Sequence, residues 1–447
     1  MSNVGRAILL LAVLTFAAVV CAEVRYTVTD LGTLGGRTSY VGGINERGQI
    51  VGWSETGVNQ PSRAFRWDPG GGMVDLGALA TARGSVGMAI SNDGRAVGYC
   101  FVNSVGRGFR TAPDSVIDPV ADDIGSLTGS SGSVFTHDVN ANGCVVGTGK
   151  DGFGWSRAIL YDGSQVVSLG EKTLTAYGIN DQGVICGEAW TDTGDLHAFL
   201  VPPGRDVDMA TDDLGTLGGN QSEAYDLNEA GHVVGMAKNR FRDVRPFLYR
   251  YGRMEDLGTA GGPEARANAV NNHDQVVGWS DTSVLLKTAF LWEWGRLWDL
   301  NELIPANSGW YLEEAKDIND LGQIVGHGTI QGQVHAFLLD PLTPPRHPGD
   351  SDGDGRVDFL DALALTAAWG SGEGDPLYDP NVDFNSDGTI DLSDAFELNQ
   401  NWGWAAEPPP PVGVVPEPAG ALLLLGPALL LQRMHRRRIR RSRAWAP

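Results

Sequence analysis

The chain has 447 residues, enough for more than one domain with a hydrophobic core. Hydrophobic residues make up 42% of it and glycine occurs 61 times, which excludes a disordered chain and suits many short strands joined by tight turns. Arg6 and seven arginines after position 432 sit at the ends and leave 25 cationic against 55 acidic residues, so the body carries a charge near −30. Such a body repels nucleic acid and anionic membranes, and it could hold divalent cations.

Residues 1–22 have the pattern of a secretory signal peptide. Arg6 gives the positive start, and residues 7–20 form an apolar run too short for a comfortable membrane span. Small residues around Ala22 offer a cleavage site. Cys21 leaves a lipoprotein as the alternative, although Val20 before it fits that pattern poorly. We therefore expect a secreted protein.

A nine-residue pattern, typified by residues 44–52, recurs seven times at spacings of 40–49 residues. Its first polar slot falls at Asn45, Ser91, Asn140, Asn180, Asn228, Asn271 and Asn319. Its turn position falls at Gly48, Gly94, Gly143, Gly183, Gly231 and Gly322, with Asp274 in one copy. The asparagine opens a hairpin turn by bonding to the backbone, and glycine takes the left-handed position.

Two more signatures follow the turn in most copies. One is a small residue followed by an apolar one, and the other is Asp-Leu-Gly or a looser version of it. The first occurs at Ala64-Phe65, Ala158-Ile159, Ala198-Phe199, Ala289-Phe290 and Ala336-Phe337, and the second begins at Asp30, Asp75, Asp213 and Asp256, with looser copies at Asp123, Ser168 and Asp299. Each unit thus predicts four short strands, which is the period of a propeller blade.

The ends of the array predict how it closes. The last copy ends near Pro341 without an Asp-Leu-Gly strand, whereas the chain begins with a spare one at residues 26–32. Pairing the two completes a seven-bladed β-propeller over residues 23–342 and leaves no open edge. An open β-solenoid is the alternative. The fold class is therefore mainly β, followed by a small α-helical module.

These units resemble the HAF repeat of bacterial extracellular proteins, whose name is spelled by His197-Ala198-Phe199 and His335-Ala336-Phe337. The resemblance covers roughly residues 26–340 and implies a secreted or surface role without a known reaction. Arginine and threonine fill the same slot as His197 and His335 in other copies, so we expect both histidines to be structural.

After a linker at residues 343–348, two twelve-residue segments have the spacing of calcium-binding loops. The first places Asp350, Asp352, Asp354, the Arg356 carbonyl, Asp358 and Asp361 at ligand positions, and the second places Asp383, Asn385, Asp387, the Thr389 carbonyl, Asp391 and Asp394 there. Apolar helices are expected to follow at residues 359–370 and 392–403. The sequence therefore predicts two bound Ca²⁺ ions.

This pair of loops resembles a type I dockerin, which carries two loop–helix repeats with Asp at loop position 12. The resemblance implies a module at residues 349–405 and a cohesin-like partner. Dockerins commonly have a Ser-Thr pair at loop positions 10 and 11, where this chain has Phe359-Leu360 and Leu392-Ser393. That departure leaves the identity of the partner open.

A Pro-rich linker at residues 406–414 leads to a tail at residues 415–447. The tail contains Pro416-Glu417-Pro418, an apolar run at 419–431 and seven arginines. It resembles the PEP-CTERM sorting signal, which implies processing by an exosortase-type enzyme. Because the run is short for a bilayer and arginines stay in the cytoplasm, we expect a transient membrane association on the way to the cell surface through the inner membrane. An ordinary tail anchor is the alternative.

No motif of a hydrolase nucleophile, a metalloprotease or a P-loop is present. The sequence therefore favours a non-enzymatic surface protein whose propeller binds an extracellular polysaccharide or a surface protein. A polysaccharide-active hydrolase or lyase with its site at the propeller mouth is the alternative. The aromatic candidates for contact with a ligand are those outside the repeat pattern, namely Trp190, Trp294, Trp298, Trp310 and Tyr311.

Overall fold

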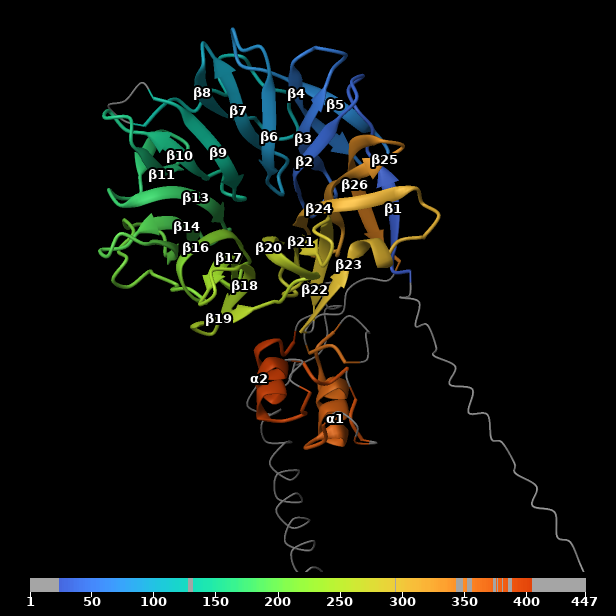
Figure 1. The fold of residues 1–447 in the computed structure, drawn as a ribbon. Helices are drawn as coiled ribbons and strands as arrows, with labels where there is room; N and C mark the ends of the chain where they lie inside the picture. Colours follow the sequence, from blue (N-terminus) through green and yellow to red (C-terminus); the bar gives the residue numbers. More distant parts are fainter. Residues whose placement is uncertain are drawn as a thin grey trace, which may run out of the picture.

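The computed structural model describes residues 24–127, 132–293, 295–342, 349–351, 356–372, 375, 377–379, 381–384 and 388–403. Within these ranges the chain is mainly β, with two short α-helices near the C-terminal end. The strands stand in successive antiparallel groups around a common centre, and the helices lie beside the rim of this ring (Figure 1).

The groups repeat along the chain. They are β2 (Ser39–Ile44), β3 (Ile50–Glu55), β4 (Ser62–Asp68) and β5 (Gly72–Gly77); β6 (Ser85–Ile90), β7 (Ala96–Val102) and β8 (Val105–Arg110); β9 (Val134–Val139), β10 (Val145–Lys150), β11 (Ser156–Tyr161) and β12 (Val166–Ser168); and β13 (Thr173–Ile179), β14 (Ile185–Trp190) and β15 (Leu196–Val201). Next come β16 (Gly218–Leu227), β17 (Val233–Asn239), β18 (Val244–Arg250) and β19 (Arg253–Asp256); β20 (Gly261–Val270), β21 (Val276–Thr282), β22 (Lys287–Glu293) and β23 (Arg296–Asp299); and β24 (Trp310–Ile318), β25 (Ile324–Ile330) and β26 (Gln333–Pro341), preceded by the 3₁₀ turn η1 (Leu300–Glu302).

Two of these groups depart from the predicted four strands. Where a fourth strand was expected in these groups, the chain pairs with β8 only between Phe109 and Asp123, and with β15 only between Phe199 and Asp213. Single parallel pairings also join β15 to β16 and β18 to β20, so that β13 to β23 form one continuous sheet. The first strand of each group contacts the first strand of the next, and β24 contacts β2.

The spare N-terminal strand β1 (Tyr26–Asp30) pairs antiparallel with β26, which places Asp30 opposite Phe337. The same register places Asp75 opposite Phe65 and Asp256 opposite Phe247. β1 therefore takes the place of the fourth strand in the last group, as the sequence predicts. The two ends of the array meet in one sheet (Figure 1).

The two signatures of the repeat meet across this outer hairpin. In several units the basic residue before the small and apolar pair contacts the aspartate of Asp-Leu-Gly, as in His197 with Asp213 at 2.9 Å and His335 with Asp30 at 3.0 Å. Arg107 contacts Asp123 at 2.7 Å in the same way. Arginine and histidine are therefore interchangeable in this slot because both pair with the same carboxylate.

The repeated asparagine links each unit to the next. Its side-chain oxygen accepts hydrogen bonds from its own turn, and its Nδ2 donates to the backbone oxygen of the equivalent residue in the following unit. These links run from Asn45 to Ser91, from Asn140 to Asn180, on through Asn228, Asn271 and Asn319, and from Asn319 back to Asn45, at 2.9–3.2 Å. Ser91 has no amide to donate, so among the described residues the ladder is interrupted between Ser91 and Asn140.

We expect Ser91→Asn to stabilise the protein by about 1 kcal/mol, because it would add the missing hydrogen bond between two units. The turn at Ser91 has the same backbone hydrogen bonds as the turn at Asn45, so an asparagine fits its geometry. Thermal unfolding of the full chain measures the change. Asn180→Ala is the matched control and should destabilise, since it leaves buried partners unsatisfied. A melting temperature of Ser91→Asn at or below the wild-type value would contradict this role.

Three aspartates near the centre of the ring also bridge units. Asp138, Asp226 and Asp317 stand two residues before the repeated asparagine, and each accepts a hydrogen bond from the backbone of the next unit at 2.8–2.9 Å. Burial raises their pKa values, to about 6 for Asp138 and about 7 for Asp317, and the other carboxylates add to this effect. The folded protein therefore holds protons that the unfolded chain releases.

This arrangement predicts a pH dependence for Asp317. Because its pKa is raised from 3.8 to about 7 on folding, its contribution to stability falls as pH rises between those values, at up to about 1.4 kcal/mol per pH unit. Asp317→Asn cannot titrate, so the variant should lose less stability than wild type between pH 5 and pH 8. Chemical denaturation at both pH values measures this, with the exposed Asp206→Asn as control. Equal pH slopes for wild type and Asp317→Asn would contradict the prediction.

The C-terminal part forms a separate small core around α1 (Phe359–Ala368) and α2 (Leu392–Gln400). The predicted helices were too long at their C-terminal ends, because Gly370 and Gly403 adopt positive φ and the chain leaves the helix before them. On the rim of the ring, the Tyr251 hydroxyl donates to Glu397 of α2 at 2.7 Å and its ring meets Phe396 edge-on. No helix of the described ranges is long and apolar enough to cross a membrane.

Candidate functional site

The first candidate site is the pair of predicted calcium loops. Of the twelve predicted ligands, Asp352, Asp354, Asn385 and Asp387 lie outside the described residues, whereas Asp350, Arg356, Asp358, Asp361, Asp383, Thr389, Asp391 and Asp394 lie within them. Asp350, Asp361, Asp383 and Asp394 are at most 5% exposed. Among the described residues, no three His, Cys, Asp or Glu side chains stand close enough to form a metal site by themselves.

Each loop folds back onto the carboxylate at its twelfth position. Asp361 accepts hydrogen bonds from the backbone of Ser351 at 2.6 Å and of Asp358 at 2.8 Å, while Asp358 caps α1. Asp394 and Asp391 repeat this arrangement at the start of α2. The capping boxes hold the position-12 carboxylates at the helix N-termini, where the helix dipole favours them.

The donors suit calcium. Ca²⁺ takes six to eight oxygen ligands, and carboxylates and backbone carbonyls are the oxygens these loops supply. Burying several carboxylates in one small module is costly unless a cation compensates their charge. The described residues therefore fit a Ca²⁺ ion in each loop, which Asp350, Asp361, Asp383 and Asp394 would help to hold.

The second candidate site is a set of positions on the ring that vary while the rest of the repeat is kept. In each unit, one variable position directly follows a pair of an apolar residue and a glycine in the second strand, such as Val51-Gly52. The residue that pairs with this position on the first strand varies as well. The opposed pairs are Tyr40 with Trp53, Val86 with Tyr99, Phe135 with Thr148, Glu223 with Met236, Arg266 with Trp279 and Glu314 with His327, and Thr175 with Glu188 is the seventh. We call these fourteen residues the variable face.

A bulge in each of the seven first strands adds another variable residue near the opposed pair. The register slips around one unpaired residue, and a bulge of this kind turns a side chain away from the regular alternation. The unpaired residues are Gly42, Met88, His137, Tyr177, Tyr225, Asn268 and Lys316. A scaffold of repeated residues therefore presents different chemistry in each unit.

Side chains of the variable face and the bulges contact one another from unit to unit. Tyr177 and Tyr225 lie with their ring centres 5.3 Å apart, and the Tyr225 hydroxyl lies 2.7 Å from Glu223 and 3.0 Å from Arg266. Lys287 adds two further contacts, because its ammonium lies over the Trp279 ring and pairs with Glu314. Tyr40 stacks on Trp53 and meets His327 edge-on. These contacts join polar and aromatic groups of several units into one network, in which Thr175, Glu188, Met236 and Glu314 are buried and the other members of the variable face are partly exposed.

Two carboxylates on this surface differ in charge state. Burial raises the pKa of Glu188 to about 7, and the neighbouring Glu223 adds to the effect. Burial also acts on Glu314, but Lys316 and Lys287 outweigh it and hold its pKa at about 2. The surface therefore carries a protonatable carboxyl on one side and a permanent ion-pair cluster on the other.

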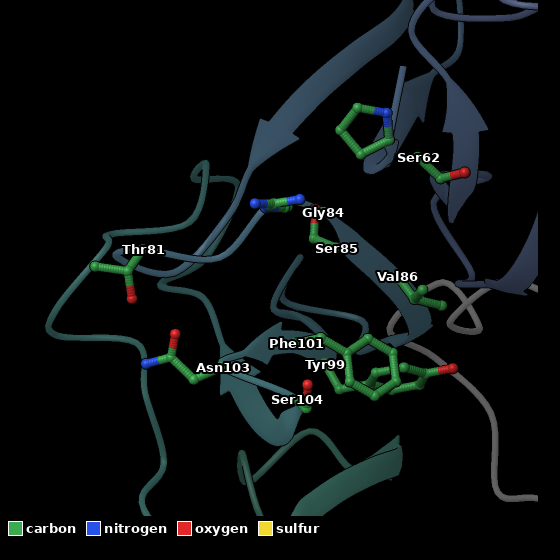
Figure 2. A pocket seen from close by; sticks show the side chains of 11 residues that line it. Ser62, Thr81, Gly84, Ser85, Val86, Tyr99, Phe101, Asn103 and Ser104 are labelled. Carbon is green, nitrogen blue, oxygen red and sulfur yellow. The ribbon is translucent and has the colours of Figure 1, made fainter. Parts of the chain in front are cut away.

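A cavity of about 710 Å³ opens next to the variable face in the second unit (Figure 2). It is lined by Pro61, Ser62, Thr81, Arg83, Gly84, Ser85, Val86, Tyr99, Phe101, Asn103 and Ser104. The rings of Tyr99 and Phe101 lie together on one side, with Thr81 and Asn103 on the other (Figure 2). A volume in the range of roughly 300–1,000 Å³ is typical of small-molecule sites.

Comparison with known proteins identifies the C-terminal part. The dockerin type I domain family matches residues 348–401, which contain both loops and both helices. The chain contains a type I dockerin domain. A second family, described as a protein of unknown function (DUF3466), matches residues 165–337 of the ring. None of the curated proteins matches the chain.

Several solved structures resemble the ring at low identity. The BP39L lectin from Burkholderia pseudomallei is 8% identical with a TM-score of 0.41, covering 70% of this chain and 95% of the lectin. The WD40 β-propeller domain of Doa1 is 10% identical with a TM-score of 0.39, covering 69% and 96%. A puromycin-hydrolysing peptidase of Mycobacterium tuberculosis is 15% identical with a TM-score of 0.38, covering 67% and 51%.

The dockerin exposes apolar side chains on both of its helices. Large side chains at the start of each helix are about half exposed, and they fall at matching positions in the two repeats. These are Phe359, Leu360 and Leu363 of α1, and Leu392 and Phe396 of α2. We call them the apolar face of the dockerin. It includes loop positions 10 and 11, where the sequence departs from the usual Ser-Thr pair.

The aromatic residues proposed from the sequence are scattered. Trp190 and Tyr311 are exposed, Trp298 and Trp310 pack against the core, and Trp294 lies outside the described residues. Sequence reasoning looked for residues outside the repeat and so missed the variable face, which lies inside it. The signal was present, because the residue after each apolar-Gly motif changes from unit to unit.

Proposed function

We propose that this is a secreted, surface-sorted, non-enzymatic glycan-binding protein with a calcium-dependent dockerin. Its ring is a seven-bladed propeller of HAF-type repeats over residues 23–342, and its binding surface is the variable face. Support for seven blades comes from the return of β24 to β2 and from the Asn319–Asn45 link. Two Ca²⁺ ions occupy the dockerin loops.

The variation inside the repeat carries this proposal. Turn, core and linking residues recur in unit after unit, so folding alone does not require the variable face to change. Aromatic rings and hydrogen-bonding groups alternate on it, which suits the apolar faces and hydroxyl edges of sugar rings. The body is strongly acidic, and this further disfavours nucleic acid as the ligand.

A glycan array probed with the calcium-loaded full chain tests the proposal. We expect binding to a limited set of extracellular polysaccharide fragments, together with weaker binding in a variant that replaces Trp53 and Trp279 by alanine. The exposed Trp155→Ala is the matched control. Failure to bind any glycan, together with capture of a protein by the same surface, would replace the glycan by a protein ligand.

One observation favours a second function, that of a polysaccharide-active hydrolase or lyase. Glu188 and Glu223 interact electrostatically, and Tyr177, Tyr225 and Arg266 surround them. A carboxyl with a raised pKa beside a second carboxyl can divide the roles of acid and base. Release of products from polysaccharides by the wild type, abolished in Glu188→Gln, would establish this activity, and intact substrates after long incubation would exclude it.

We further propose that the apolar face of the dockerin binds a protein partner through apolar contacts, in place of the hydroxyl contacts of a Ser-Thr pair. The sorting tail at residues 415–447, which lies outside the described residues, is cut by an exosortase-type enzyme after transient insertion into the inner membrane. Mass spectrometry of the surface protein should then find no peptide from residues 419–447. Recovery of the arginine tail would identify a permanent anchor.

A further inference from the structure

Several hydrogen-bonding side chains that line the cavity in the second unit have no partner among the described residues. The side chains of Ser62, Thr81, Arg83, Asn103 and Ser104 line it and make no hydrogen bond or ion pair with any residue that the structure describes. Ser85, also in the lining, is fully used, since its hydroxyl donates to Gly77 and accepts from Ala64. Five polar side chains around one cavity are therefore available to a ligand.

An aromatic platform forms one wall of the same cavity. Phe101 is 53% exposed although it is a large apolar side chain, and Tyr99 packs against its ring edge-on at 5.7 Å. Phe135 of the next unit packs against both rings, with ring centres 5.1 Å and 6.0 Å away. The platform is thus held in place by packing and still presents an apolar surface to the cavity.

Strained backbone positions surround this cavity. Thr81, Asn103 and Ser104 have φ values of +64°, +51° and +66°, and they are three of the ten non-glycine residues with positive φ in the described ranges. Such a conformation is unfavourable for a β-branched residue such as threonine, and strained residues tend to gather at functional sites. Asn103 and Ser104 form the two-residue turn between β7 and β8, where Asn-Gly would be the relaxed choice.

A second, smaller cavity adjoins the first. It measures about 420 Å³ and shares Asn103 with it, so the turn at Asn103 stands between the two. Its lining includes the Arg107–Asp123 pair and the apolar residues Leu79 and Val105. A ligand longer than one ring can therefore extend past the turn.

We propose that the first cavity is a binding site for one pyranose ring of an oligosaccharide, and that the adjoining cavity takes the next ring. Phe101 and Tyr99 contact the apolar face of the sugar. Ser62, Thr81, Asn103 and Ser104 bond to its hydroxyl groups, and Arg83 bonds to a hydroxyl or to the carboxylate of a uronic acid. This inference rests on the proposed glycan-binding function and places one sugar site where Val86 and Tyr99 of the variable face line the cavity.

Three single variants of the full chain test the assignment. Phe101→Ala removes the exposed platform, Arg83→Gln removes the cation, and Asn103→Gly removes the amide while keeping a residue that accepts positive φ. Phe153→Ala, at a 91% exposed phenylalanine of another unit, is the control. Titration calorimetry with neutral and with uronic oligosaccharides, chosen from the array, gives the affinities.

We expect Phe101→Ala to weaken binding about tenfold or more, which corresponds to about 1.4 kcal/mol, while Phe153→Ala leaves it unchanged. A selective effect of Arg83→Gln on uronic oligosaccharides assigns Arg83 to the carboxylate, and an equal effect on both classes assigns it to hydroxyls. Removal of calcium should not alter these affinities, because no residue of the dockerin loops lines the cavity.

The possible failures can be told apart. If glycans bind and none of the three cavity variants weakens them, the sugar site lies elsewhere on the ring and this assignment is wrong, while the proposed function stands. If no glycan binds to a folded wild type, the proposed function and the sugar site both fail. Circular dichroism and thermal unfolding of each variant verify that it is folded before its affinity is measured.

Discussion

Removing calcium from the full chain will unfold residues 349–403 and leave the ring folded. The buried carboxylates Asp350, Asp361, Asp383 and Asp394 repel one another once no cation compensates them, and the small core around Leu365 and Leu398 is too limited to hold the module alone. The double substitution Asp350→Ala with Asp383→Ala should have the same effect as a chelator, because it removes the first ligand of each loop.

The measurement is helical circular dichroism during a calcium titration, combined with proteolysis to locate the unfolded part. Wild type should gain helical signal and become resistant to cleavage within residues 349–403, and the double variant should do neither. Asp192→Ala, which removes an exposed carboxylate of the ring, is the control and should respond like wild type. A calorimetric titration without any heat of calcium binding would disprove the site.

Deleting residues 24–33 should destabilise the ring severely. The deletion removes β1, which buries Tyr26, supplies Asp30 to His335 and occupies the fourth-strand register opposite Phe337. It also uncovers the edge of β26, and an unpaired strand edge is a template for aggregation. We expect the melting temperature to fall by 10 °C or more. In domains of somewhat smaller size, each kcal/mol of lost stability lowers the melting temperature by roughly 2–4 °C.

Thermal unfolding and light scattering measure this effect. A synthetic peptide of residues 24–33 should bind the shortened chain and restore part of the lost stability, since β1 is joined to the ring by pairing and not only by the chain. The exposed-turn variant Phe153→Ala serves as a control for general damage. A shortened chain that melts like wild type and stays monomeric would show that β1 is dispensable.

Local rules made much of the ring predictable from sequence. The turn at Asn45–Gly48, the outer hairpin from Ala64 to Leu76 and the pairing of the spare strand with residues near Phe337 all follow from spacing, turn chemistry and the need to cover an edge. The predicted loops fall inside the matched dockerin because twelve-residue calcium loops carry their ligands at fixed intervals.

Contacts between units could not be predicted in the same way. The donation from Asn319 to Asn45 and the pairing of His335 with Asp30 join residues about three hundred positions apart, and only the closed arrangement brings them together. The variable face was missed for a related reason. Its residues are separated by a whole repeat, so Tyr225 and Arg266 read as unrelated until the sheets place them 3.0 Å apart.

The contact between Tyr251 and α2 has a consequence for the protein partner that we propose for the dockerin. The two halves of the apolar face are related by the internal repeat, so by themselves they offer a partner two equivalent orientations. Tyr251 contacts Phe396 and Glu397 of α2, although Phe396 stays 52% exposed, close to the 49% of Phe359 on α1. The rim of the ring therefore stands beside the α2 half of the apolar face, and this contact makes the two halves unequal for the partner that we propose.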